Sequence, residues 1–179
     1  MTKKVTLIIF IVFNILAIIY LIKPTPVLPD LYDSVKSDLP GDTVQISNTT
    51  GYFTNLSRDE VMNFYKKHYH NFFRLNLNHP PEKAKEIIVD TIPSYYLEEL
   101  VLPYKESLYI NGFEWEKDVF TKPEKRLKNK IYYQDEPYSA KITIRRFPVS
   151  IPNRLLAFFI TESGIIFAFL VYKKFIKSK

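Results

Sequence analysis

Two polar residues inside long apolar runs are the strongest candidates for chemistry in this sequence. Asn14 lies within the run Val5–Ile22, and Glu162 lies within the run Leu155–Tyr172. If these runs are membrane helices, an ionised carboxylate at the helix centre costs at least about 2.5 kcal/mol. A carboxyl group in such a place is retained for pairing, for protonation or for a route through the bilayer. Glu162 is therefore the residue to examine first.

Asn14 and Glu162 are expected to lie at the same depth. Asn14 is nine positions from the start of its run, and Glu162 is ten positions from the end of its run. At 1.5 Å per residue, both lie about 14–15 Å from the same membrane surface when the helices are antiparallel. We expect a hydrogen bond between them, with the carboxyl group neutral. Small neighbours that would permit close helix approach are Thr161, Ser163 and Gly164. In the alternatives, Glu162 meets a partner subunit, or the span is shifted and Glu162 lies near water.

The cysteine and histidine content argues against a catalytic or metal-binding pattern. The chain has no cysteine, which excludes thiolate catalysis, zinc–thiolate sites and disulfides. The histidines are His68, His70 and His79; on a helix, positions 68 and 70 point to nearly opposite sides and cannot share a metal ion. We expect His68 on an apolar helix face and His70 in water. The sequence predicts no metal, no cofactor and no enzymatic activity.

Three charged clusters are better explained as solvated surface. Glu114 and Glu116 share a strand face like a carboxylate pair, but the nearby aromatic residues point the other way, and glycosidase pairs need aromatic platforms in a cleft. The pair Glu98-Glu99 is expected on a helix surface. The basic segment Lys122–Lys130 is expected to be a solvated loop, with contact to lipid phosphates or an acidic partner as the alternative.

The elements that position Asn14 and Glu162 are two predicted transmembrane helices, residues 5–22 and 154–172. Runs of this length are near the minimum that spans a hydrocarbon core of roughly 30 Å. The first run could instead be a signal peptide, because Lys3 and Lys4 precede it. However, Ile22-Lys23-Pro24 follows it without a small-x-small cleavage site, so an uncleaved anchor is the better interpretation.

The distribution of charge predicts the orientation of these helices. Between Lys23 and Asn153 there are 18 Lys or Arg residues and 18 Asp or Glu residues, so the net charge of +6 comes from the tails, residues 1–4 and 173–179. Short basic tails remain in the cytoplasm, so both termini should be inside and the central domain outside, in a bacterial cell membrane or inner membrane. The same argument excludes a nucleic-acid partner. The lysines expected to contact the anionic inner leaflet are Lys3, Lys4, Lys173, Lys174, Lys177 and Lys179.

Residues 23–29 predict an extended proline-rich linker, and residues 30–150 an extracytoplasmic α+β domain with an antiparallel sheet. Its clearest helix runs from Arg58 to Phe73 after a capping box of Ser57 and Glu60. The apolar stripe of this helix comprises Val61, Phe64, Tyr65, His68, Tyr69 and Phe72. Further helices are predicted at Pro80–Val89 and Ser94–Leu102.

The strand predictions are two short pairs and one hairpin. Thr43–Ser47 should pair with Gly51–Thr54, and Lys130–Gln134 with Tyr138–Phe147. Ser107–Glu116 predicts a hairpin that turns at Asn111-Gly112, which suits a type I′ turn. An apolar pocket between helix and sheet would be lined by Phe64, Tyr65, Tyr69 and Trp115.

A short stretch of the domain resembles a known type of protein. Leu39-Pro40-Gly41-Asp42, followed by Glu60-Val61 and Phe64-Tyr65, is similar to a pattern in extracytoplasmic domains of uncharacterised bacterial membrane proteins and lipoproteins. The resemblance covers about 30 residues and implies no activity. The order of helix, outer domain and helix is also that of haem–copper oxidase assembly factors, whose motifs this chain lacks.

The function predicted from these features is a non-enzymatic, membrane-anchored scaffold or accessory subunit. Its outer domain would bind a protein partner, and its helices would pack in the lipid bilayer with another membrane protein or a second copy of the chain. The alternative is an extracytoplasmic domain that binds or senses a ligand. An assembly factor for a membrane complex is the third hypothesis.

Overall fold

The computed structural model describes residues 3–40, 42, 46–87, 96–118 and 121–177, which form two compact units. One unit is helical and combines Met1–Thr25 with Pro148–Lys179. The other unit, Pro26–Phe147, contains the sheet and is called the sheet unit below. Both ends of the sheet unit therefore continue into the helical unit.

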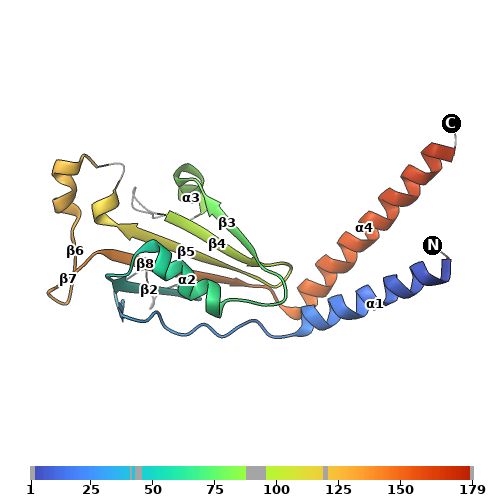
Figure 1. Ribbon diagram of the computed structural model, residues 1–179, viewed down its shortest axis with the longest axis horizontal. Helices are drawn as coiled ribbons and strands as arrows, with labels where there is room; N and C mark the ends of the chain where they lie inside the picture. The colour runs from blue at the N-terminus through green and yellow to red at the C-terminus, as the bar shows by residue number, and fades with distance from the viewer. Residues whose placement is uncertain (1–2, 41, 43–45, 88–95, 119–120, 178–179) are drawn as a thin grey trace. The chain divides into compact units, whose positions relative to one another are not determined.

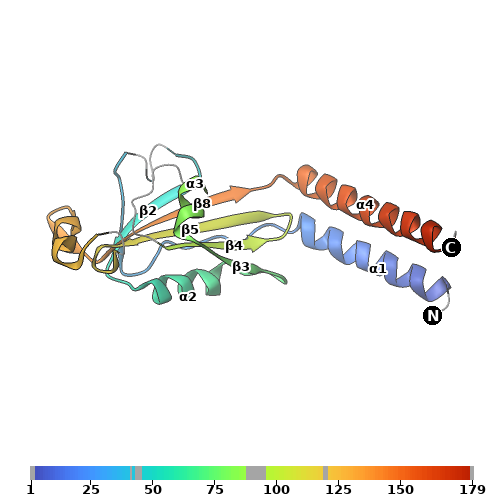
Figure 2. The same cartoon turned by 90° about the horizontal axis from the view of Figure 1, so that it is seen from above.

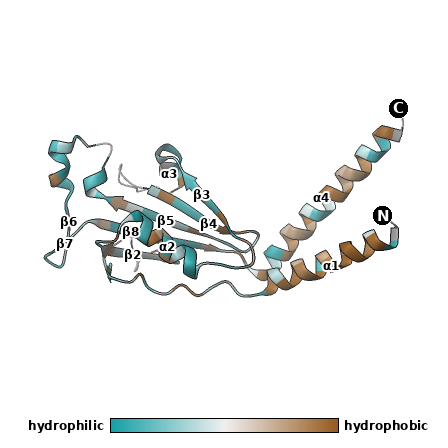
Figure 3. Ribbon diagram, in the orientation of Figure 1, coloured by the Kyte–Doolittle hydropathy of each residue, from teal (hydrophilic) through white to brown (hydrophobic). Residues whose placement is uncertain are grey.

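The helical unit consists of α1 (Lys3–Ile22) and α4 (Ile151–Lys177), which lie side by side (Figures 1 and 2). α4 is longer than the predicted segment 154–172 at both ends. Its first turn contains Pro152, a position where a helix does not need the missing N–H group. Figure 3 shows that both helices are apolar along most of their length.

The sheet unit is built on a six-stranded antiparallel sheet with the order β1-β2-β8-β5-β4-β3. Its strands are β1 (Ser34–Lys36), β2 (Thr49–Thr54), β3 (Leu75–His79), β4 (Tyr96–Leu102), β5 (Glu106–Glu114) and β8 (Ala140–Pro148). A separate hairpin pairs β6 (Ile131–Tyr133) with β7 (Glu136–Tyr138). Short 3-10 helices, η1 (Trp115–Lys117) and η2 (Pro123–Asn129), precede this hairpin. The described part of the chain thus confirms an antiparallel-sheet domain between two apolar helices.

Helix α2 (Arg58–His68) lies on one face of the sheet and supplies much of the core (Figure 2). The capping box of Ser57 and Glu60 is present, as predicted. The helix ends at His68 instead of Phe73, because the Arg74 guanidinium donates hydrogen bonds to the carbonyl oxygens of Lys66 and Tyr69. These bonds satisfy carbonyl groups that another helical turn would have used.

One predicted helix and one predicted turn are parts of strands in the structure. Ser94–Leu102 was expected to be helical, but its described part is β4, while residues 94 and 95 lie outside the described residues. The hairpin predicted at Asn111-Gly112 is also wrong, since β5 passes straight through both residues and pairs with β4. Gly112 allows the Tyr96 ring to pack closely against the backbone of β5, since a Cβ atom at this position would lie 2.2 Å from Cζ of Tyr96.

The actual β4–β5 connection is at residues 103–105, where Tyr104 has a φ of 62°. Strand β3 was not predicted. Helix α3 (Pro81–Ile87) covers the described part of the predicted helix at Pro80–Val89, and residues 88 and 89 lie outside the described residues.

The predicted short strand pairs have different partners from those expected. β2 pairs with β1 and β8, while the described residues of Thr43–Ser47 are not a strand, and residues 43–45 lie outside the description. β6 pairs with β7 across a turn at Gln134 and Asp135, whose φ values are 52° and 66°. β8 covers most of the predicted strand Tyr138–Phe147, and its alternate residues Ala140, Ile142 and Ile144 are buried.

Candidate functional site

The candidate site is the contact between α1 and α4, which we call the helix seam. The residues of both helices that are buried or half-buried recur at helical spacing, so each helix presents one narrow face to the other. Leu21, Arg154 and Phe158 are buried within it. The described residues of the helix seam are Asn14, Ala17, Ile18, Tyr20 and Leu21 on α1, and Arg154, Leu155, Phe158 and Glu162 on α4.

The structure brings together the two polar residues that the sequence pairs. The Asn14 side-chain nitrogen donates a hydrogen bond to Glu162 Oε1 at 2.7 Å. The same nitrogen donates to the carbonyl oxygen of Phe10 at 3.1 Å, one turn earlier on α1. An amide nitrogen carries two N–H groups, so both bonds can form together. Asn14 is thereby held by its own helix while it binds the carboxyl group of the other.

Arg154 is a further polar residue in the helix seam, and it was not predicted. Its guanidinium donates to the carbonyl oxygens of Leu21 at 3.2 Å and Lys23 at 3.5 Å, and to that of Val149 at 2.6 Å. The last carbonyl groups of a helix lack intrahelical partners and carry partial negative charge. A buried arginine therefore caps the C-terminal end of α1. The available signal was a lone arginine at the start of an otherwise apolar run.

The small residues next to Glu162 do not build the contact, contrary to expectation. Thr161 donates its hydroxyl to the Ala157 carbonyl oxygen at 2.8 Å within its own helix, and Thr161 and Ser163 are both exposed. A Cβ atom added to Gly164 would meet nothing within 4 Å. Close approach of the helices therefore relies on the larger side chains of the helix seam, such as Phe158, whose ring lies 6.3 Å from that of Phe13.

The predicted pocket does not assemble from its four residues. Tyr65 and Tyr69 are fully buried in the core between α2 and the sheet, and the Tyr69 hydroxyl donates to the Glu106 carbonyl oxygen at 3.2 Å. Burial raises the pKa of Tyr65. Trp115 lies on η1, where its indole nitrogen donates to the Tyr138 carbonyl oxygen at 3.2 Å. Of the four, Phe64 lines a hollow that the structure describes.

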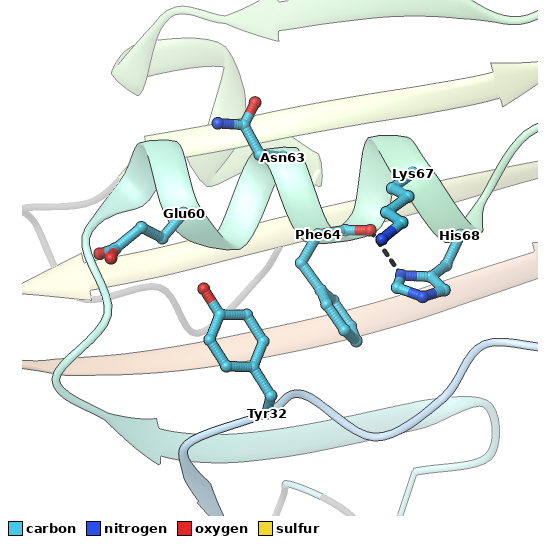
Figure 4. Close-up of a pocket in the computed structure, with 6 residues that line it drawn as sticks. All are labelled: Tyr32, Glu60, Asn63, Phe64, Lys67 and His68. Carbon is cyan, nitrogen blue, oxygen red and sulfur yellow. Dashed lines mark hydrogen bonds between the residues drawn. The ribbon is translucent and has the colours of Figure 1, made fainter.

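That hollow lies on the outer side of α2 (Figure 4). The Phe64 ring lies between those of Tyr32 and His68, with ring centroids 5.4 and 4.4 Å away. His68 Nδ1 is 2.9 Å from the Phe64 carbonyl oxygen. The hollow is open to solvent and has both signs of charge at its rim; its lining residues are Tyr32, Glu60, Asn63, Phe64, Lys67 and His68.

The sheet unit also contains ion pairs that sequence reasoning did not predict. Glu106 is buried and accepts two hydrogen bonds from Arg146, at 2.8 and 2.9 Å. These bonds raise the pKa of the Arg146 guanidinium. Glu98 and Glu99, expected on a helix surface, are buried on β4, where they pair with Arg58 and His79.

Two further groups belong to this network. Glu114, expected in solvent, accepts a hydrogen bond from the backbone N–H of Arg58 at 2.9 Å, at the start of α2. Tyr109 lies beside Glu99, and burial together with that carboxylate raises its pKa to about 12. Among the residues that the structure describes, no group of three or more acidic or histidine side chains could hold a metal ion. These charged groups form pairs within the sheet unit.

The terminal lysines are exposed where the structure describes them, at Lys4, Lys173 and Lys174. The side chains of Lys3 and Lys177, and all of Lys179, lie outside the described residues.

No protein-family model, curated protein or solved structure matches the chain. The functional argument therefore depends on the helix seam and on the surfaces of the two units.

Proposed function

We propose that the chain is a two-pass membrane protein that holds its sheet unit outside the cell membrane as a scaffold or accessory subunit. The observation that carries this proposal is the exposed apolar surface of both helices. Outside the helix seam, large apolar side chains such as Leu7, Ile8 and Phe167 are more than half exposed. A surface of this kind is covered by lipid or by another apolar protein surface.

The lengths of the helices support a membrane-spanning role. A helix of 20 residues such as α1 is about 30 Å long, and α4 with 27 residues is about 40 Å long. The hydrocarbon core is roughly 30 Å thick. The basic tails favour both termini on the cytoplasmic side, with the lysines against the anionic inner leaflet.

The extent of the helix seam supports a partner within the membrane. On α4, every described side chain from Ser163 to Ile176 is exposed, and on α1 the same is true from Lys4 to Val12. About half of each helix therefore lies outside the helix seam. We propose that another membrane protein or a second copy of the chain packs there.

Single cysteines test the topology, because the natural chain has none. In intact cells, a membrane-impermeant maleimide should label Tyr132→Cys, and it should label Lys174→Cys only after permeabilisation. Alkaline carbonate should leave the protein in the membrane. Labelling of both cysteines from outside, or release by carbonate, would overturn the topology.

The scaffold role has its own test. Purification in a mild detergent should recover the chain together with a membrane protein or as an oligomer. Recovery as a single copy without any other membrane protein contradicts an accessory role.

A second candidate function is ligand binding at the hollow on α2. The observation in its favour is the row of rings formed by Tyr32, Phe64 and His68 at a solvent-open surface. A ligand that binds there should raise the melting temperature of the natural chain but not of Phe64→Ala. A melting temperature that rises equally in both proteins would contradict this site.

A further inference from the structure

The end of the sheet unit at which the chain enters and leaves has an unusual surface. We call it the exit end. The chain enters the sheet unit at Pro26 and leaves it at Phe147, and these two residues are called the crossing points. The Arg146 guanidinium donates a hydrogen bond to the Pro26 carbonyl oxygen at 3.3 Å, so the two crossing points lie next to each other. Both connections to the apolar helices therefore start from the same place on the sheet unit.

The turn between β4 and β5 and the loop after α2 lie at the same end. Arg146 pairs with Glu106 at the start of β5, and Glu106 pairs in register with Leu102 at the end of β4. The Tyr69 hydroxyl reaches the carbonyl oxygen of the same Glu106, which brings the end of α2 here as well. Loop residues 70–74 continue from that point into β3, whose first residue, Leu75, pairs with Val101.

Large apolar side chains are exposed at the exit end. Phe72 is 98% exposed and Phe73 is 54% exposed, although phenylalanine side chains usually lie in a core. Tyr104 in the β4–β5 turn is 38% exposed, Phe147 is 40% exposed and Val27 is 88% exposed. These residues come from four separate segments, and the fold of the sheet unit brings them to one end.

The charge at the exit end is positive. One acidic residue, Glu106, is present in the segments that meet at this end, and it is paired with Arg146. These segments are residues 26–28, 66–75, 101–107 and 145–147. The Arg145 guanidinium lies 4.9 Å from the centre of the Phe147 ring. Apart from Arg146, the basic residues of these segments are Lys66, Lys67, Arg74, Lys105 and Arg145, of which Lys105 is fully buried.

We propose that the exit end docks on the lipid headgroups of the outer leaflet, with Phe72 and Phe73 inserted among them. This inference rests on the proposal that α1 and α4 cross the membrane. Phe147 is followed by only three residues before α4, and such a connection reaches on the order of 10–15 Å. Tyrosine side chains such as Tyr104 favour the membrane–water interface, and exposed phenylalanine side chains can bury their apolar area there. Lysine and arginine side chains bind lipid phosphates. The occupant is therefore a phospholipid surface.

The opposite end of the sheet unit offers a matched control. β5 runs away from the exit end, and the segment after it, 115–139, contains Leu127 and Tyr132, which are 72% and 62% exposed. These side chains are as exposed as those of the exit end, but no chain connection to the apolar helices starts there. Lipid should reach Phe72 and not Tyr132.

The test uses the full chain in vesicles of phosphatidylcholine and phosphatidylglycerol. Trp115 is the one tryptophan of the chain, so Trp115→Phe removes the background emission. A tryptophan is then placed by Phe72→Trp or by Tyr132→Trp. Emission from Phe72→Trp should be shifted to shorter wavelength and mostly quenched by lipids brominated near the headgroup. Emission from Tyr132→Trp should stay at the wavelength of a tryptophan in water, without quenching.

Several outcomes would overturn the inference. If Phe72→Trp resembles Tyr132→Trp while carbonate still leaves the protein in the membrane, lipid docking is wrong and the proposed topology stands. If carbonate releases the protein, the proposed topology itself fails. A blue-shifted Phe72→Trp that brominated lipid does not quench means that protein covers the exit end.

A second probe covers the case in which Trp115→Phe does not fold, since the indole of Trp115 has a hydrogen bond. Nitroxides on Phe72→Cys and Tyr132→Cys keep Trp115 in place. The first nitroxide should be accessible to oxygen dissolved in the bilayer, and the second to a water-soluble nickel chelate. Equal accessibility of both nitroxides to the chelate would overturn the inference.

Discussion

The sheet unit and the helical unit both hold ionisable side chains in buried or half-buried positions, but these side chains have different partners. In the sheet unit charge meets opposite charge, as in Glu106 with Arg146 and Glu98 with Arg58. In the helical unit, Arg154 binds backbone carbonyl groups and Glu162 binds the neutral amide of Asn14. Removing one side chain of a buried ion pair leaves the other as an unpaired charge inside the fold. Removing one partner of a hydrogen bond to a neutral amide or carbonyl group has a smaller electrostatic cost. The sheet unit should therefore be far more sensitive to single substitutions.

The largest effect is expected for Arg146→Ala. The Glu106 side chain is fully buried, so the substitution leaves an unpaired carboxylate inside the fold. Breaking a buried pair in this way costs about 3–5 kcal/mol of the free energy of unfolding. Urea denaturation of the full chain in detergent, followed by the emission of Trp115, measures the loss.

The control for Arg146→Ala is Lys36→Ala. It breaks the exposed pair of Lys36 and Asp30, which should cost under about 1 kcal/mol. The double substitution of Glu106→Gln with Arg146→Met should recover much of the stability that Arg146→Ala loses. Equal losses for Arg146→Ala and Lys36→Ala would contradict the contrast between buried and exposed pairs.

The next effect compares a glycine from each unit. Gly112→Ala places a Cβ atom 2.2 Å from the Tyr96 ring and should cost about 1–3 kcal/mol, as overpacking does in a filled core. Gly164→Ala meets no neighbour within 4 Å and should be neutral or stabilise α4 by up to about 1 kcal/mol. Thermal unfolding followed by circular dichroism measures both. A loss for Gly164→Ala larger than that for Gly112→Ala would show that α4 is closely packed there.

Arg154→Met should loosen the helical unit without unfolding the sheet unit. The substitution removes the cation that caps the end of α1, an interaction of up to about 2 kcal/mol in a partly buried setting. Spin labels at Ile19→Cys and Leu156→Cys report the distance between the helices by pulsed electron resonance, and the distance distribution should broaden. Arg154→Lys retains the charge and should broaden it less. An unchanged distribution for Arg154→Met would show that the cap is not needed.

The smallest effect is expected for Asn14→Leu, which removes the hydrogen bond to Glu162. Polar bonds between membrane helices contribute about 0.6 kcal/mol on average. The same spin-label pair should show a small broadening, and Glu162→Gln should show almost none because its side-chain oxygen still accepts the bond. Thr161→Val, which affects a hydroxyl bonded within α4, is the control. A broadening for Thr161→Val equal to that for Asn14→Leu would refute a specific role for the pair.

Features with a local signal could be predicted from the sequence. The apolar runs predicted α1 and α4, and the capping box predicted the start of α2. The alternation of apolar and polar residues predicted β8. The pairing of Asn14 with Glu162 came from equal depth along antiparallel helices. Each of these signals lies within a few turns of one element, or follows from simple helix geometry.

Features set by distant partners could not be predicted. The segment Ser94–Leu102 was predicted to be a helix, but pairing with β5 on one side and β3 on the other makes its described part a strand. Asn111-Gly112 suggested a turn, whereas the glycine is needed for the ring of Tyr96 on the neighbouring strand. Likewise, nothing adjacent to Glu98 in the sequence indicates that Arg58 will neutralise it.

The place of β8 in the sheet has a consequence for biosynthesis. β8 is the last strand to leave the ribosome, yet it lies between β2 and β5 in the finished sheet. Until residue 148 has emerged, β2 and β5 have no shared neighbour and present open strand edges that can pair with other chains. α4 begins three residues after β8 ends. Completion of the sheet is therefore timed to the arrival of the second apolar helix, and a chain that stops early cannot close its sheet.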